Sequence, residues 1–348
     1  MINEIYKNSS LLKWERPNEI SGDCRLALFE RLLKFYNIDC NIDDLLGYGE
    51  GLDFNISEVK VGNKLNLLYV FGRKINCEKI YSKRFNISLF CKSSMKQTDL
   101  FDTEIAHHIK SGTPVVVNVD RFYLDFLNVK KAHFGYHVVM IIDICKEDEK
   151  ISILDIMSPK IECMDIKVLK DAMYSNIEFT PPNGEWYCIK NVDKCKVKNI
   201  DTFKHSLFNQ SASFLDKNGS LDQMHQVINV INKLISKSKL NRIYEDYLGY
   251  EIPLLKSIFY EQEGSGTFYR KSYFNFIEMN CKLYNEISLY NEISKLILCD
   301  IDLWKNIQHE LNSCNNIILQ AKKMSELLTN IFEIERDIFK KINSKFKE

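Results

Sequence analysis

The sequence predicts an α+β domain followed by a helical domain. An amphipathic stretch, CRLALFERLLKFY, precedes several β-branched apolar runs in the first half of the 348-residue chain. After about residue 200, long stretches with helical periodicity dominate instead. A helix followed by a sheet is typical of an α+β domain, and successive amphipathic helices are typical of a bundle. We therefore expect domains at residues 1–197 and 198–348.

The elements of the first domain follow from local patterns. Apolar residues recur at helical spacing from Cys24 to Tyr36, with Gly22 or Asp23 as the N-cap. DLFDTEIAHHIKSG is a second expected helix, ending at Gly112, a residue type favoured just past a helix. TPVVVNVD and EWYCIK are expected strands, and DIKVLKDAMYS is an expected helix between them. HVVMIIDI and KISILDI flank the charged turn CKEDEK, which predicts a hairpin.

The second domain is interrupted by glycine. Asn218-Gly219 separates one helical stretch from the next, and EGSG precedes another. The pentapeptide YNEIS occurs at 284–288 and again at 290–294. A six-residue offset does not fit a heptad, so we interpret it as a local duplication.

Composition excludes some partners and locations. Lys and Arg number 47 against 47 Asp and Glu, so the net charge of zero favours neither nucleic acid nor an anionic membrane. The N-terminus lacks a signal-peptide pattern, and runs such as VVMII are too short to span a membrane. We expect a cytoplasmic protein. Its eleven cysteines lie singly, so most are expected to be small buried hydrophobes.

Cys24 has the context of a nucleophile. It lies in the first turn of the expected helix and follows the irregular polar segment ERPNEISGD. A helix N-terminus supplies partial positive charge and free N–H groups, which favour a thiolate. Position alone also fits a buried structural cysteine.

His137 and Asp155 are the expected partners of that thiol. His137 begins a strand just after Gly135, where a histidine can face a nucleophile in a cleft. Asp143 is six residues along the same strand, about 20 Å away, and cannot orient the ring. Folding the hairpin brings Asp155 roughly opposite His137, where cross-strand neighbours lie about 5 Å apart. Asp155 is therefore the expected orienting carboxylate.

Two other chemistries are disfavoured. His133 and His137 have an HxxxH spacing, but that pair binds zinc only on one helical face, and glycine and β-branched residues argue against a helix there. We therefore expect no metal. The segment LLGYGEGLDF lacks the Lys-Ser/Thr of a phosphate loop. It is interpreted as a tight loop near the cleft, with Gly49, Gly51 and Tyr136 as candidate cleft residues.

The N-terminal half resembles the butirosin biosynthesis protein H-like family. The residues that carry the resemblance occur in order over about 20–175: DCRLALFERLLKFY, DLLGYGEGLDF, HHIKSGTPVVVNVDRFYL, AHFGYHVVMIIDI and ILDIMSP. In the helical half, GSGTFYRKSYFNFI, with Gly264, Gly266, Arg270 and Tyr273, is similar to the glycine-then-Arg/Tyr signature of the domain that follows in that family.

The resemblance implies a papain-like fold and an acyltransferase. Such an enzyme takes an acyl group from a carrier-protein thioester and passes it to an amine, as a papain-like amide synthetase of closthioamide assembly does. It implies catalytic roles for Cys24, His137 and Asp155. Papain-like enzymes also use an amide side chain shortly before the cysteine to bind the oxyanion, and Asn18 is the candidate here.

The expected partners follow from the same resemblance. They are an acyl or peptidyl carrier protein, whose phosphopantetheine presents the substrate, and an amine acceptor, with no separate cofactor. Carrier proteins are usually acidic, so Arg73, Lys74, Lys83 and Arg84 are candidate contacts. A hydrolytic enzyme with the same three residues (a cysteine peptidase, an amidase or a thioester hydrolase) and a non-catalytic scaffold remain open alternatives.

Overall fold

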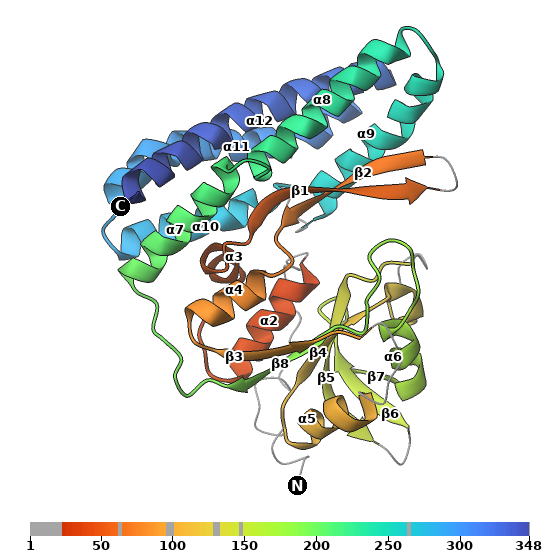
Figure 1. The fold of residues 1–348 in the computed structure, drawn as a ribbon, viewed down its shortest axis with the longest axis vertical. Helices are drawn as coiled ribbons and strands as arrows, with labels where there is room; N and C mark the ends of the chain where they lie inside the picture. The colour runs from red at the N-terminus through yellow and green to blue at the C-terminus, as the bar shows by residue number, and fades with distance from the viewer. Residues whose placement is uncertain are drawn as a thin grey trace. The chain divides into compact units, whose positions relative to one another are not determined.

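The computed structural model describes residues 23–61, 65–94, 101–127, 133–145, 149–262 and 266–347, which fall into two compact units (Figure 1). Unit 1 joins the described residues up to Ile42 with Phe85–Lys196, and unit 2 joins Asp43–Arg84 with the residues from Val197 onward. Both helices and sheets are present, which confirms the α+β prediction. Each unit is described by itself below.

Unit 1 is built on a six-stranded sheet. Its strands run in the order β3-β8-β4-β5-β6-β7, and every neighbouring pair is antiparallel. The strands are β3 Ser88–Lys92, β4 Val115–Val119, β5 His137–Cys145, β6 Lys150–Leu154, β7 Glu162–Asp165 and β8 Trp186–Asn191. The predicted strands in TPVVVNVD and EWYCIK are thus β4 and β8, which pair with each other in the centre of the sheet.

The first helix of unit 1, α2 (Cys24–Phe35), packs against the sheet and contacts β5 (Figure 1). Asp23 is its N-cap, and the Asp23 side chain accepts a 2.8 Å hydrogen bond from the Leu26 N–H. Such a cap satisfies one of the free N–H groups of the first turn. Its apolar side, including Phe29 and Leu32, is completely buried, as the helical spacing predicts.

The predicted hairpin is formed by β5 and β6. Met140 pairs with Leu154, and Cys145 pairs with Lys150 on the far side of the turn. The register shifts between Ile141 and Asp143, so one residue of β5 bulges. This pairing places the start of β5 close to the residue that follows β6.

The remaining helices of unit 1 are short. They are a π-helix at Phe101–Ile105, α5 Ala106–Lys110, a 3₁₀-helix at Arg121–Tyr123 and α6 Ile166–Met173. Gly112 has φ of 79°, so it ends the second predicted helix in the left-handed conformation that glycine adopts most readily.

Unit 2 contains a two-stranded sheet as well as helices. The hairpin of β1 (Leu52–Val61) and β2 (Leu65–Arg73) contacts α8 and α9 (Figure 1). The helices are α3 Ile42–Tyr48, α4 Cys77–Arg84, α7 Ile200–Leu215, α8 Ser220–Ser238, α9 Ile243–Glu261, α10 Arg270–Leu283, α11 Ile287–Asn312 and α12 Ile317–Phe346. The break between α7 and α8 falls at Asn218-Gly219, as expected.

The compact units differ from the predicted division at residues 43–84. The sequence assigned this segment to the first domain, whereas in the structure it clusters with the helices that follow residue 197. Phe54 and Val70, from the two strands of the hairpin, are completely buried in the same hydrophobic core as Trp304. The segment therefore supplies part of the core of the helical unit.

Arg270, from the glycine-then-Arg/Tyr signature, is buried in that core. Its Nε and Nη2 donate to both carboxylate oxygens of Glu335, at 2.7 and 3.1 Å, and its Nη1 donates to the carbonyl of Asp53 at 3.0 Å. The guanidinium also lies 4.8 Å from the Trp304 ring. Bidentate pairing and aromatic contact satisfy the buried charge, which gives this arginine a structural role in unit 2.

Candidate active site

Cys24 begins α2, so its thiol lies at the N-terminal end of that helix. Its Sγ is 3.9 Å from the backbone carbonyl of Tyr136, the residue just before β5. The N–H groups of a first helical turn lack carbonyl partners within the helix and carry partial positive charge. The position therefore favours negative charge on an oxygen bound beside the sulfur.

His137 and Asp155 form a buried pair next to this thiol. The His137 Nε2 lies 2.6 Å from Asp155 Oδ2, and the exposed fractions of the two residues are 3% and 0%. The other carboxylate oxygen accepts a 2.8 Å hydrogen bond from the Met157 N–H. Both oxygens of Asp155 are thus occupied, which holds the carboxylate in place. Because Nε2 faces Asp155, the Nδ1 side of the ring is left for Cys24.

The electrostatics of the pair favour a protonated imidazole. Burial, the largest single influence, lowers the pKa of His137, but the charges of Asp155 and Cys24 and hydrogen bonds to both raise it. The balance raises the pKa of His137 to about 10. An imidazolium at neutral pH is the state expected of a histidine that has accepted the proton of a neighbouring thiol.

The structure brings these three side chains together, and Asp155 rather than Asp143 holds the ring. Asp143 pairs with Ser152 across the hairpin, and its side chain accepts from the Ile144 N–H. Tyr136, a candidate cleft residue, offers its backbone carbonyl to the thiol. Asn18, the candidate oxyanion residue, lies outside the described residues.

Gly49 and Gly51 belong to unit 2 and are packed closely there. A Cβ at Gly49 would lie 2.4 Å from the Leu45 carbonyl oxygen, and a Cβ at Gly51 would lie 2.7 Å from the Cys77 sulfur. The absence of a side chain at both positions is therefore required by local packing. A role for them in a cleft stays a prediction.

A network of polar side chains that local sequence patterns do not reveal fixes α2 on the sheet. Arg25 Nη1 donates to Asn118 Oδ1 at 3.2 Å, and Nη2 lies 3.1 Å from Glu185 Oε1. Asn118 in turn donates to Glu185 Oε2 at 2.7 Å, and Arg25 lies over the Tyr187 ring. This buried arginine follows Cys24 directly, so it ties the start of α2 to the centre of the sheet. In the sequence, this network is indicated only by an arginine on the core side of an amphipathic helix.

A second Asp–His pair lies before β5. The buried Asp120 carboxylate is 2.6 Å from His133 Nδ1 and accepts from the Ser175 hydroxyl at 2.7 Å. Its other oxygen accepts from the backbone N–H groups of Phe122 and Phe134. Burial alone would raise the pKa of Asp120, but these hydrogen bonds outweigh it and lower the pKa. Asp120 therefore orders the segment that leads to Tyr136 and His137.

Within the described ranges, no group of three or more His, Cys, Asp or Glu side chains is placed to hold a metal ion. Over the same ranges, no helix is both long enough and apolar enough to cross a membrane.

The fold and the site define an α+β domain that carries a cysteine–histidine–aspartate cluster between a helix N-terminus and a strand. Residues 23–156 match the family model described as butirosin biosynthesis protein H, N-terminal. The match confirms the resemblance of this segment of the chain to that family. No curated protein matches the chain. The matched segment includes all three residues of the cluster.

The basic residues considered for a carrier protein differ in their surroundings. Arg84 is buried in unit 2, where it pairs with Glu50 and donates to the Tyr48 carbonyl at 2.8 Å. It is therefore committed to its own unit and does not offer a free cation to a partner. Lys74 lines a pocket of unit 2.

Proposed function

We propose that this chain is a cysteine-dependent acyltransferase that moves an acyl group from a carrier-protein thioester to an amine. The observation that carries the proposal is the buried His137–Asp155 pair beside a thiol at the start of α2. The family match over residues 23–156, named for a biosynthetic protein, supports synthesis rather than degradation. The papain-like architecture implied by the resemblance agrees with a helix carrying the cysteine and a sheet carrying the histidine.

In the first step, His137 accepts the proton of Cys24 and the thiolate attacks the thioester carbonyl. Asp155 keeps the imidazolium oriented, with Nε2 toward the carboxylate and Nδ1 toward the sulfur. The tetrahedral oxyanion is stabilised by the N–H of Cys24 at the helix N-terminus, with Asn18 as a candidate second donor. Collapse breaks the C–S bond to the carrier, and the departing thiolate takes the proton from His137.

In the second step, an amine attacks the acyl group on Cys24. His137 accepts a proton from the attacking nitrogen, and the Cys24 thiolate leaves as the amide forms. Amide formation requires that the amine reach the acyl group more readily than water does. The same three residues with water as acceptor would give a hydrolase.

Intact-mass spectrometry tests the first step. The full chain is incubated with an acyl thioester of pantetheine and, in parallel, with the same acyl group on a carrier protein. We expect one acyl group on Cys24, and its absence in Cys24→Ala. Cys163→Ala is a matched control because it removes an exposed cysteine of the same unit. An acyl adduct that persists in Cys24→Ala contradicts the proposal.

Product analysis tests the second step. The acylated protein is given a primary amine, and amide and free acid are quantified. Amide as the main product supports the transferase. Free acid alone, with and without amine, assigns a hydrolase, and no turnover of either kind assigns a scaffold.

A further inference from the structure

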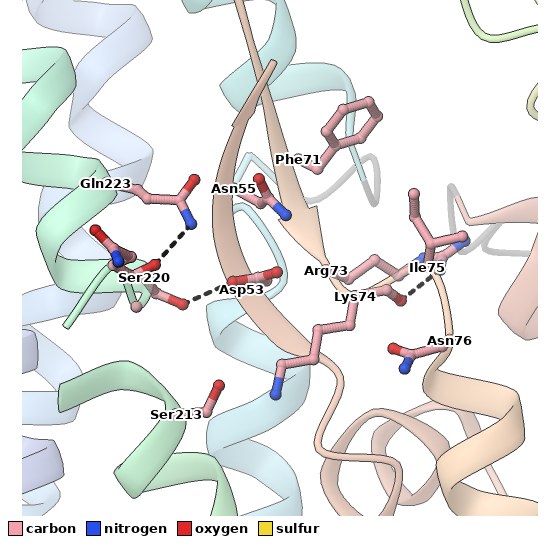
Figure 2. Close-up of a pocket in the computed structure, with 12 residues that line it drawn as sticks. Asp53, Asn55, Phe71, Arg73, Lys74, Ile75, Asn76, Ser213, Ser220 and Gln223 are labelled. Carbon is pink, nitrogen blue, oxygen red and sulfur yellow. Dashed lines mark hydrogen bonds between the residues drawn. The ribbon is translucent and has the colours of Figure 1, made fainter. Parts of the chain in front are cut away.

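Unit 2 contains a polar pocket of about 400 Å³ that no step above uses (Figure 2). It lies where the β1–β2 hairpin meets the turn between α7 and α8, and its lining includes Asp53, Asn55, Lys74, Ser213 and Ser220. Ligand pockets in proteins measure about 300–1,000 Å³, so the volume suits a small molecule. The lining carries one carboxylate, Asp53, and two cationic side chains, Arg73 and Lys74, together with amide and hydroxyl groups.

Asp53 supplies the negative charge and is held in a fixed position. Its Oδ1 accepts from the Ser220 hydroxyl at 2.7 Å and from the Phe54 N–H at 2.9 Å (Figure 2). The residue is 8% exposed. In the part of the chain that the structure describes, no hydrogen bond reaches its other oxygen, Oδ2. The N-terminus of α8, which begins at Ser220, favours the negative charge.

Lys74 supplies the positive charge. Its side chain extends toward Ser213 in Figure 2, whereas the guanidinium of the neighbouring Arg73 donates to the Lys74 carbonyl at 3.1 Å. Among the described residues, no ion pair joins Lys74 to Asp53 or to another carboxylate. A half-buried ammonium and a buried carboxylate therefore line one pocket without neutralising each other directly. Within the described ranges, Asp53 Oδ2 lacks a hydrogen-bond donor and the Lys74 ammonium lacks a carboxylate partner, so a ligand that pairs with each would be stabilised by both.

We propose that this pocket binds a small zwitterion of the amino-acid type. The ligand's ammonium donates to Asp53 Oδ2, and its carboxylate pairs with the Lys74 ammonium. The Asn55 amide and the Ser213 hydroxyl provide further hydrogen bonds to a polar ligand. An inorganic anion alone would leave Asp53 Oδ2 without a donor, and a simple amine would leave the Lys74 ammonium without a carboxylate.

Calorimetric titration of the full chain tests the site with ω-amino acids from glycine to 6-aminohexanoate. The series varies the distance between the two charges, and butylammonium and butanoate are singly charged comparisons. We expect at least one zwitterion to bind about ten-fold or more tightly than either comparison. Cys24→Ala is expected to bind like the parent protein, so failure of the acyl-transfer proposal leaves this result unaffected.

Two variants and two controls locate the binding. Asp53→Asn and Lys74→Gln are each expected to weaken the best zwitterion about ten-fold or more. Glu58→Gln and Lys79→Gln change exposed charges of unit 2 outside the pocket and are expected to bind normally. If Asp53→Asn fails to fold, Lys74→Gln alone decides. Unchanged affinity in Lys74→Gln overturns the proposal, as does binding of inorganic phosphate with no preference for a zwitterion.

Discussion

The imidazole of His137 is subject to two opposed influences at the scale of a single residue. Burial disfavours its charge, while a fully buried carboxylate at 2.6 Å and a neighbouring thiol favour it. In the proposed reaction, His137 can hold a proton only if the carboxylate and the thiol outweigh the effect of burial. Asp155 is therefore the residue whose change should affect chemistry without altering the nucleophile itself.

We expect Asp155→Asn to lower kcat/KM for acyl transfer by about 10²–10⁴-fold. The amide keeps the volume of the carboxylate but loses the charge that stabilises the imidazolium, and it can orient the ring wrongly. The pKa of His137 should fall, so the alkaline limb of the activity profile should move to lower pH. Asp143→Asn, on the same hairpin, is the control and should retain activity. A parent-like pH profile in Asp155→Asn would refute the orienting role.

The raised pKa of His137 also predicts how stability depends on pH. A group whose folded pKa of about 10 exceeds its ordinary value of 6.5 stabilises the folded state fully below pH 6.5. That contribution is lost as pH rises from 6.5 through 10. We expect the difference in unfolding free energy between the parent and His137→Gln to shrink by about 1 kcal/mol or more between pH 6 and pH 9.5. Denaturant titrations at the two values measure it, and a constant difference would contradict the assignment.

Residues of the site differ in how readily they can be predicted from the sequence. Cys24, His137 and Asp155 could be chosen from a helix start, a strand start and the geometry of one hairpin together with the family resemblance. The partners of Arg25 could not, because Asn118 and Glu185 lie 93 and 160 positions away. No local period specifies which buried polar groups will meet after the sheet has formed.

At the scale of an element, α2 must be held so that its first residue meets the start of β5. Hydrophobic packing of one helical face permits sliding and rotation, whereas the Arg25 hydrogen bonds to Asn118 and Glu185 define one position. We expect Arg25→Met to destabilise unit 1 by about 2–4 kcal/mol, because the buried Asn118 amide and the partly buried Glu185 carboxylate lose their donor. It should also reduce kcat more than KM. Denaturation and kinetics measure both effects.

Lys34→Met provides the comparison within the same helix. Lys34 pairs with Glu30 one turn earlier, and its side chain is 40% exposed. Pairs of this kind contribute about 0.2–0.5 kcal/mol, so the change should be small and activity unaffected. Equal effects of the two substitutions would show that Arg25 does not anchor the helix.

The repeated pentapeptide YNEIS shows why element boundaries are hard to predict. In the first copy, Asn285 has φ of 60° and Ile287 begins α11, whereas the second copy, 290–294, lies wholly within that helix. Identical residues thus form a turn in one place and helix in the other. Tertiary packing overrides local propensity over such short segments.

At the scale of the whole molecule, the order of segments along the chain does not match their grouping into compact units. Local patterns predicted strands β4, β5, β6 and β8 of unit 1 but not β3 or β7, and residues 43–84 join the helices that follow residue 197. The Leu52 backbone, for example, exchanges hydrogen bonds with the Gln210 side chain, 158 positions later. Alternating apolar residues can indicate that a hairpin buries one face, but they do not specify which distant helices cover it.

The core of unit 2 predicts a second pH dependence through Asp300. This buried carboxyl lacks a hydrogen-bond partner among the described residues, and burial raises its pKa well above the ordinary value, aided by the nearby Glu335 charge and opposed by Arg270. A carboxyl with a raised folded pKa destabilises the folded state increasingly as pH rises above about 4. Asp300→Asn removes that ionisation while keeping the shape.

We therefore expect Asp300→Asn to gain stability relative to the parent as pH rises. The gain between pH 4.5 and pH 7.5 should reach at least about 1 kcal/mol, since one pKa unit corresponds to about 1.4 kcal/mol. Denaturant unfolding of both proteins at the two pH values measures the difference in unfolding free energy. Comparing the two pH values removes any pH-independent loss of stability that the buried amide causes. Asp302→Asn, two residues along the same helix and outside the core, is the matched control. A difference that stays flat, or that grows toward acid, would show that Asp300 is not held in its protonated form.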